Sequence, residues 1–442
     1  MNKRIPTQPG RGRRPKPLVL DELTIAATNT HTIRHVLSRW AQRLEQAFQS
    51  QPVRLLLPDD RPLYVAAVRA WRALAARDRN VAAQLLRLPT HAVLIECAVR
   101  HAHAGGDHDA LSAWVRELSA LILLELAALG ELPEAGAECF HLPAGALRDL
   151  RSIRLNLLLP LPTTALTLRF LPGELHVEAE NAASPLVVTL QRDAPLPVFD
   201  SLPEGAVPEA PASRPYHEIV PGIFLALSDN NPLSDFEAHP DKTGNTLSLG
   251  DKPVEAWLGS LRSCFAMIQT YLPHLAAELR LVARLIVPVG WDAERHLSAS
   301  YQEYIGAVYM TLHPNDMTMV EAVIHEFQHN KINAAFNLDP LLHNAFSPLF
   351  SSPVRPDPRP LHGVILAVHA FQPVALLYER MQQEGHAFAA NPSWQRRFAA
   401  IVEKIREGAA TVLDNAEPTT VGRPVFEEMR RWDAHFAGLQ QA

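Results

Sequence analysis

Two histidines and a glutamate form the segment with the clearest chemistry in the 442-residue sequence, His325-Glu326-Phe327-Gln328-His329. If the segment is helical, His325 and His329 project from the same face about one turn apart. Two imidazoles in that arrangement can bind one divalent ion without distorting the backbone. Glu326 would then act as general base on a bound water, or as a hydrogen-bond partner that orients the site.

The surrounding residues predict the helix that this segment needs. Apolar residues recur at helical spacing, and Asp316 or Thr318 can cap the first turn: Val320, Val323, Ile324, Phe327. An H-E-x-x-H string also arises by chance in helices that contain histidine. The amphipathic pattern and the cap are the context that a metal site requires, so we favour a metal site over a surface coincidence.

A metal held by two histidines needs a third protein ligand, and four downstream residues could supply it. They are His343, His362, His369 and Glu379. His343 lies in a predicted loop, whereas the other three share a helix that Pro360 opens. We favour His369, since an imidazole in the middle of this apolar helix would be costly to bury without a partner. His362 comes second, and a core histidine with another partner is the alternative.

A proline-rich stretch, residues 347–360, separates the two helices and suits neither a helix nor a central strand. We expect it to pass near the metal. Arg355 and Arg359 could each present a guanidinium fork to a carboxylate, as an anionic cosubstrate beside a metal would require. The alternative for each is an ordinary surface arginine.

Longer motifs around the segment carry a resemblance to a known family. They are residues 307–314, residues 317–324 leading into the segment, Asp357-Pro358-Arg359-Pro360-Leu361, Ala367-Val368-His369-Ala370-Phe371, and more faintly residues 229–233 and His239-Pro240. Together they cover about the last half of the chain. This half resembles the HExxH-motif peptide-modification proteins encoded beside ribosomally made natural-product precursors, which are non-haem iron, 2-oxoglutarate-dependent peptide β-hydroxylases.

By that resemblance the metal would be Fe(II), with 2-oxoglutarate and O₂ as cosubstrates and a ribosomally made precursor peptide as partner. The ligands would be His325, His329 and a downstream histidine, which we carry over to His369. Some relatives have that histidine three residues earlier, where this chain has Leu366. One of the two arginines would pair with 2-oxoglutarate. The peptide could add as a strand to an exposed edge of the sheet expected in residues 153–191.

Two other interpretations compete with hydroxylation. On the five-residue motif alone a zinc metallopeptidase would be the first choice, because the same histidines bind Zn²⁺ and Glu326 can activate water. A non-enzymatic scaffold that presents a leader peptide is the second. Metal analysis and an assay for succinate separate iron from zinc.

The elements that must position the site follow from periodicity. Helical spacing runs from Thr30 to about Gly130, and alternation begins at Ile153 and continues to Val177. A proline-rich linker covers residues 202–215, and a helix is expected at 254–272, with strands at 281–289 and 305–312. The prediction is an α+β, mainly helical fold with a helical N-terminal region, a small antiparallel sheet and a C-terminal helical metal-binding domain.

The expected boundaries are a flexible basic tail at 1–20, a helical region at 21–150, an antiparallel β region with the linker at 151–235, and a mostly helical catalytic domain at 236–442. The tail owes its charge to six residues before the first acid: Lys3, Arg4, Arg11, Arg13, Arg14, Lys16. We expect it to be a solvated segment without a nucleic-acid or membrane contact.

Composition narrows the class of protein. The net charge is −6, so the whole molecule suggests no nucleic-acid surface, and 47% hydrophobic residues allow a large core. The three cysteines are widely spaced and form no C-x-x-C pair. No signal-peptide pattern and no run of about eighteen apolar residues is present. We therefore expect a cytoplasmic enzyme without a membrane partner.

Overall fold

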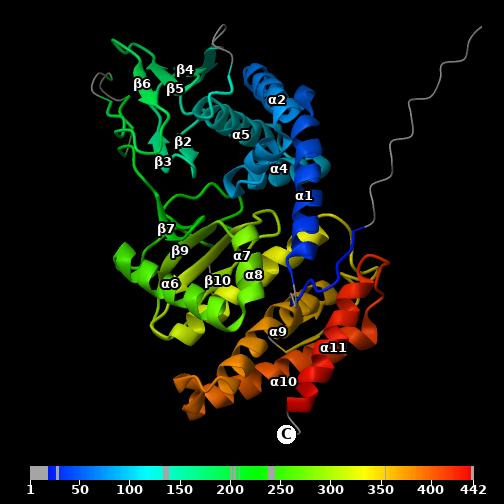
Figure 1. The fold of residues 1–442 in the computed structure, drawn as a ribbon. Coiled ribbons are helices and arrows are strands. Elements are labelled where there is room, and N and C mark those ends of the chain that lie inside the picture. Colours follow the sequence, from blue (N-terminus) through cyan, green and yellow to red (C-terminus); the bar gives the residue numbers. More distant parts are fainter. Residues whose placement is uncertain are drawn as a thin grey trace, which may run out of the picture.

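The structure, a computed structural model, describes residues 18–25, 29–132, 139–199, 202, 206–208, 210–236, 244–353 and 355–439. Within them the expected α+β, mainly helical fold is confirmed. Figure 1 shows two parts, with the N-terminal helices and a small sheet above, and a second sheet with the remaining helices below.

The upper part contains the helical region predicted from Thr30 onward. Its helices are α1 (His31–Gln49), α2 (Asp60–Arg77), α3 (Arg79–Leu86), α4 (Pro89–His103) and α5 (His108–Ala128), with a short 3₁₀ helix at Val53–Leu55. Helix α5 is buried along most of its length. Its Glu125 is fully buried, where Oε1 accepts a hydrogen bond from Ser152 at 2.6 Å and Oε2 lies 2.9 Å from the Arg154 guanidinium.

The small antiparallel sheet has the strand order β1-β4-β5-β6. Its strands are β1 (Cys139–Leu142), β4 (Leu166–Leu171), β5 (Glu174–Ala179) and β6 (Leu186–Thr189), beside the separate hairpin β2 (Asp149–Ser152) and β3 (Leu157–Pro160). The strand expected to start at Ile153 was wrong, because residues 153–156 form a turn. Asn156 there has a left-handed φ of 49°, and Ser152 Oγ accepts from the Leu155 amide at 3.0 Å.

The lower part is built on a mixed five-stranded sheet of order β10-β11-β9-β8-β7. The strands are β7 (Tyr216–Val220), β8 (Ile223–Ala226), β9 (Leu285–Trp291), β10 (Ser298–Ala299) and β11 (Ala307–Leu312). Strands β8, β9 and β11 are parallel, and β11 is buried at every position, as a central parallel strand should be. Strands β7 and β8, which the sequence assigned to the 151–235 region, thus belong to the sheet that holds the site.

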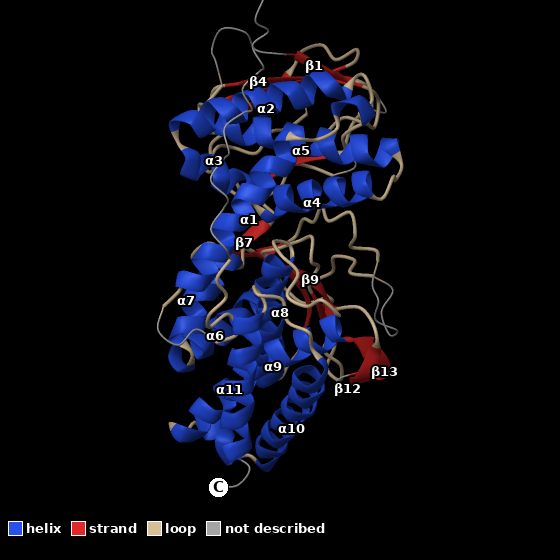
Figure 2. Cartoon of the chain, turned by 90° about the vertical axis from the view of Figure 1, so that its right-hand side faces the viewer, coloured by secondary structure: helices blue, strands red, loops and turns tan. Residues whose placement is uncertain are grey.

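Helices surround this sheet and fill the end of the molecule. They are α6 (Val254–Tyr271), α7 (Pro273–Val282), α8 (Asp316–Phe336), α9 (Leu361–Gln383), α10 (Pro392–Asn415) and α11 (Arg423–Leu439), with a 3₁₀ turn at Ala387–Ala390. Figure 2 shows α9, α10 and α11 together at the end opposite strands β1 and β4. By length and composition α9 could cross a membrane, but 78% of its apolar window is buried in this structure.

The first described segment, residues 18–25, packs into the lower part. Leu18 and Leu20, which the sequence placed in the tail, are buried. The amides of Thr24 and Ile25 donate to the Glu428 carboxylate at 2.9 and 2.8 Å, and the Thr24 carbonyl accepts from Gln328 at 2.6 Å. Residues 1–17 of the expected tail lie outside the described residues.

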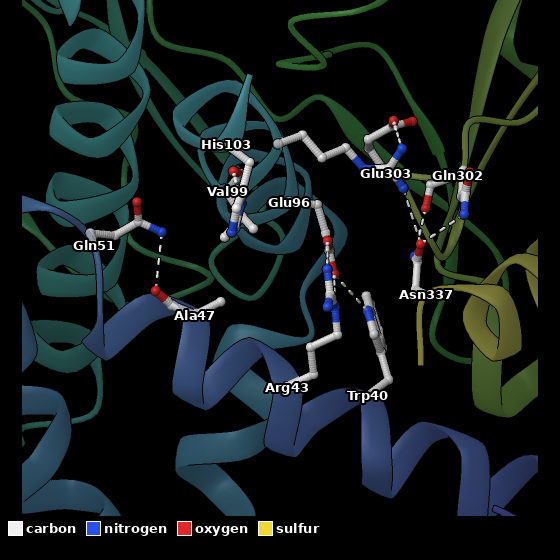
Figure 3. Close-up of polar contacts among 11 residues, drawn as sticks. Trp40, Arg43, Ala47, Gln51, Glu96, Val99, His103, Gln302, Glu303 and Asn337 are labelled. Carbon is white, nitrogen blue, oxygen red and sulfur yellow. Dashed lines mark hydrogen bonds and ion pairs between the residues drawn. The ribbon is translucent and has the colours of Figure 1, made fainter. Parts of the chain in front are cut away.

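Polar contacts hold α4 within the upper part and join it to the lower part. Within the upper part, Figure 3 shows Trp40 and Arg43 of α1 pointing toward Glu96 of α4, whose carboxylate lies 3.0 Å from Arg43 Nη2. Arg100, on the same helix α4, pairs with Glu303 at 2.7 Å and donates to Asn337 at 3.1 Å. Helix α4 is thereby linked to the C-terminal end of α8.

Candidate metal centre

Helix α8 begins directly after the central strand β11, so the sheet fixes where it starts. Its N-cap is Asn315, whose Oδ1 accepts from the amides of Met317 and Thr318 at 2.9 and 3.1 Å. The sequence predicted Asp316 or Thr318 as the cap, and this was wrong: the cap lies one residue before Asp316 and three before Thr318. An asparagine in extended conformation, next to the first free amides, satisfies them better than a residue inside the turn.

A second contact holds the middle of α8 against β11. Asn330 Oδ1 accepts from the Gly306 amide at 2.6 Å, and its Nδ2 donates to the Ala307 carbonyl at 3.2 Å. Gly306 has a φ of +96°, and a Cβ there would lie 3.0 Å from the carbonyl of Val282. The positive φ and the close Val282 carbonyl favour glycine at this position, whose amide is the group that α8 binds through Asn330.

His325 and His329 face each other on one side of α8. Their Nε2 atoms are 2.9 Å apart, and donor atoms of His325, Glu326 and His329 all lie within 4.8 Å of one another. The predicted helical spacing therefore brings the two rings together. Phe371 of α9 covers His325, with ring centroids 4.7 Å apart.

Glu326 is buried beside the pair. Its Oε1 accepts from Ser298 Oγ of the edge strand β10 at 2.7 Å. Its Oε2 and His329 Nδ1 are buried without a hydrogen-bond partner in the described part of the chain. Buried polar atoms normally have partners, so these two atoms mark a place where a ligand or water completes the site.

Both imidazoles are held in the neutral form. Burial first, then the charges of His329, Arg397 and His296, lower the pKa of His325 well below its usual range. Burial likewise lowers the pKa of His329. A neutral imidazole is the form that binds a metal.

Arg397 of α10 was missed by the sequence analysis. Its guanidinium grips both carboxylate oxygens of Glu321, with Nη2–Oε2 at 2.5 Å, and Glu321 precedes His325 by one helical turn. Tyr378 Oη donates to the same carboxylate at 2.5 Å. The Arg397 side chain is 45% exposed, and its hydrogen bonds to Glu321 use Nε and Nη2. The only sequence signal for this arginine is Glu321, a carboxylate on the same helix face as His325 that needs a positively charged partner.

The third-ligand candidates lie at different places. His369 is fully buried, and the backbone of Leu23 is the polar group that faces its ring. Burial and then the charges of Lys331 and His329 lower its pKa well below the usual range. It is not in the cluster of histidine and glutamate donor atoms that lie within 4.8 Å of one another. Its role as third ligand stays a prediction.

The other three candidates have different neighbours. His362 packs its ring on Phe336 with centroids 4.5 Å apart. Glu379 pairs with His435 at 2.8 Å. His343 lies in a loop, where its amide donates to the Glu417 carbonyl at 2.9 Å. The structure brings none of them into the cluster of donor atoms within the described residues.

The proline-rich stretch forms a hairpin of β12 (Leu349–Ser352) and β13 (Arg355–Pro360). Arg359 pairs with Asp357 of its own strand at 3.0 Å. The side chain of Arg355 lies outside the described part of the structure. Among the described contacts, Arg397 and not Arg359 is the arginine that acts on His325.

The residues present fit a divalent ion. Two nitrogens bound at ~2.1 Å to one ion lie ~3.0 Å apart at a right angle and ~3.4 Å apart at the tetrahedral angle. The observed 2.9 Å suits neighbouring positions on one ion. Two neutral imidazoles on neighbouring positions, completed by a third protein donor, can hold iron or zinc.

Comparison with known proteins adds no assignment: no protein-family model matches the chain, and no curated protein is significantly similar to it.

Proposed function

We propose that the protein is a non-haem Fe(II)- and 2-oxoglutarate-dependent dioxygenase that β-hydroxylates side chains of a ribosomally synthesised precursor peptide. The observation that supports this most is the paired Nε2 atoms of His325 and His329 beside a buried carboxylate, with an arginine one turn away. The sequence resemblance supplies iron and 2-oxoglutarate, and the donor set is compatible with both.

The chain's own side chains have separate tasks in this proposal. His325 and His329 hold the ion, and His369 is the third ligand once its ring turns toward the pair. Glu326, fixed by Ser298, accepts a hydrogen bond from a water or ligand beside the ion. Bound Fe(II), with O₂, would convert 2-oxoglutarate to succinate and CO₂ and replace a peptide β C–H bond by C–OH.

The peptide is best accommodated along the edge strand β10 rather than along the 153–191 sheet. Ser298 of β10 contacts Glu326, so a strand added here would pass beside the histidine pair. A cavity of about 660 Å³ adjoins this edge, lined by Leu233, Asp235, Phe236, Ala299, Ser300, Tyr301 and Gln302. Its size and its apolar and hydroxyl groups suit a side chain of a bound peptide.

A zinc metallopeptidase is the second candidate. It is supported by the free Oε2 of Glu326 near the histidines, where a general base for hydrolysis would lie. Both candidates use the same two ligands, so the metal and the products must decide between them.

The deciding experiment reconstitutes metal-free protein with Fe(II) or Zn²⁺ under anaerobic conditions. With Fe(II), 2-oxoglutarate, ascorbate and air we expect succinate even without peptide, and a gain of one oxygen in mass for an accepted precursor peptide. Peptide cleavage with Zn²⁺ and no succinate with Fe(II) would replace our proposal by the peptidase. If neither succinate nor a cleaved peptide is formed, both candidates are rejected.

Arg397 is expected to bind the distal carboxylate of 2-oxoglutarate. A charge-assisted hydrogen bond is worth about 1.5–3 kcal/mol, so Arg397→Gln should raise the KM for 2-oxoglutarate about tenfold or more and change kcat less. The matched control is Arg396→Gln, since neighbouring Arg396 only donates to Ser393 at 2.8 Å. Equal KM values for the two variants, or a KM effect confined to Arg359→Gln, would move the cosubstrate away from Arg397.

A further inference from the structure

A second, larger cavity of about 870 Å³ lies where the two parts of the molecule meet. Its walls come from α1, α3, the turn between β2 and β3, and the segment joining α7 to β9. Five arginines line it, Arg34, Arg79, Arg87, Arg154 and Arg284, against one carboxylate, Glu45. The chain as a whole has a net charge of −6, so this positive excess is local.

Two of these arginines are neutralised and three are not. Arg79 pairs with Glu45 at 3.2 Å, and Arg154 pairs with Glu125 at 2.9 Å. Arg34, Arg87 and Arg284 have no carboxylate partner within the ranges that the structure describes. Unpaired guanidinium groups gathered in one cavity are an arrangement that an anion stabilises.

Arg87 and Arg284 form the centre of this charge. Arg87 Nε is buried without a hydrogen-bond partner. Burial, and then repulsion from Arg284, lower the pKa of Arg87 to about 10, so the group stays charged at neutral pH. Arg284 donates to the carbonyls of Arg280 and Ala283 at 2.7 and 2.8 Å, which fixes its guanidinium in place. Two fixed like charges indicate a preformed anion site.

The cavity wall also has apolar groups between the charges. They are Leu37, Trp40, Ala41, Leu85, Leu88, Val282 and Ile305. Figure 3 shows Trp40 directed at Glu96, which accepts from its indole nitrogen at 3.3 Å. An occupant with both carboxylates and apolar side chains would match this mixed lining.

Two observations favour a peptide over a phosphate compound. The N-terminus of α3 lines the cavity, but its amides at Asn80 and Val81 already donate to Asp78 at 3.0 and 3.1 Å. Asp78 would repel a phosphate at that helix end. The unpaired arginines come from three different segments of the chain, a spread that suits carboxylates spaced along an extended chain.

We propose that this cavity binds an acidic peptide segment with at least two carboxylates and interspersed apolar side chains. The proposal deepens the proposed function, on which it rests for the identity of the peptide: the segment would be part of the precursor, held away from the residue that is modified. No lining residue belongs to the histidine cluster. Binding here should therefore be independent of metal.

The test measures fluorescence anisotropy of a short labelled peptide that alternates glutamate and leucine, with a glutamine-leucine peptide as its neutral match. The full chain is used after removal of metal with a chelator and without 2-oxoglutarate. We expect the acidic peptide to bind and the neutral one not to bind. Arg87→Gln combined with Arg284→Gln should weaken binding about tenfold or more, and added salt should weaken it further.

Three controls keep the result decisive. Arg34→Gln, at an exposed position, should weaken binding by itself even if the double variant at the less exposed Arg87 and Arg284 unfolds. Arg430→Gln with Arg431→Gln, on α11 outside the cavity, should leave it unchanged. His325→Ala should also leave it unchanged, which separates this proposal from the catalytic one. Binding of pyrophosphate but not of the acidic peptide would overturn the proposal, and so would peptide binding as tight as the parent's by both the Arg34 variant and the folded double variant.

Discussion

Replacement of His329 by alanine is expected to lower succinate formation from 2-oxoglutarate about 100-fold or more. Loss of a residue that merely orients a metal ligand already costs about 10–100-fold, and His329 is a ligand in our account. Its Nε2 lies 2.9 Å from that of His325, so alanine leaves one imidazole where two had met. Succinate is measured with Fe(II) in excess and without peptide.

The control for this prediction is His217→Ala. His217 lies on β7, at the edge of the five-stranded sheet opposite β10, so it tests removal of a histidine from the same sheet without touching the site. It should retain full turnover. A His329→Ala protein that keeps the native circular dichroism and turns over 2-oxoglutarate within a few-fold of the parent would refute the assigned ligand role.

Lys331→Ala is expected to destabilise the fold by about 3–5 kcal/mol, because it leaves a buried glutamate without its counter-charge. Lys331 of α8 and Glu278 of α7 are both essentially unexposed and lie 2.5 Å apart. The lysine also donates to the Thr24 carbonyl at 3.4 Å, so its loss loosens the segment at residues 18–25. Urea unfolding with an unchanged m-value measures the difference.

Two further variants identify the cause of that destabilisation. Lys331→Met combined with Glu278→Leu removes both charges and should recover most of the stability, since an apolar pair of similar volume replaces a buried ion pair at little cost. Arg406→Ala breaks the partly exposed pair with Asp433, 4.0 Å apart, and should cost about 1 kcal/mol or less. If Lys331→Ala and Arg406→Ala lower the free energy of unfolding equally, the Lys331–Glu278 pair does not behave as a buried ion pair.

The local features of the site followed from the sequence, and the distant ones did not. His325 and His329 meet because helical spacing alone brings them together, so the motif predicted them. Arg397 lies 72 positions after His325 in the sequence and reaches the site from helix α10. No pattern within α10 distinguishes it from Arg396, and only tertiary packing selects it.

For the fold as well, local elements were predicted from the sequence, and contacts between distant segments were not. Helices α1–α5 and α6 appeared where periodicity placed them, because each buries one face that its own residues define. Strands β7 and β8 were assigned to the wrong neighbours, since strand pairing across about sixty residues leaves no local trace. Ile153 and Leu155 alternate like a strand because both are buried in the core while Arg154 between them is exposed, although residues 153–156 form a turn.

The most direct test of the central claim is the number of Fe(II) ions retained after anaerobic equilibrium dialysis. The parent protein should hold one equivalent, and a variant with both His325→Ala and His329→Ala should hold none while its circular dichroism is unchanged. Retention of one equivalent by that double variant, or none by the parent, would contradict a metal centre at these two histidines.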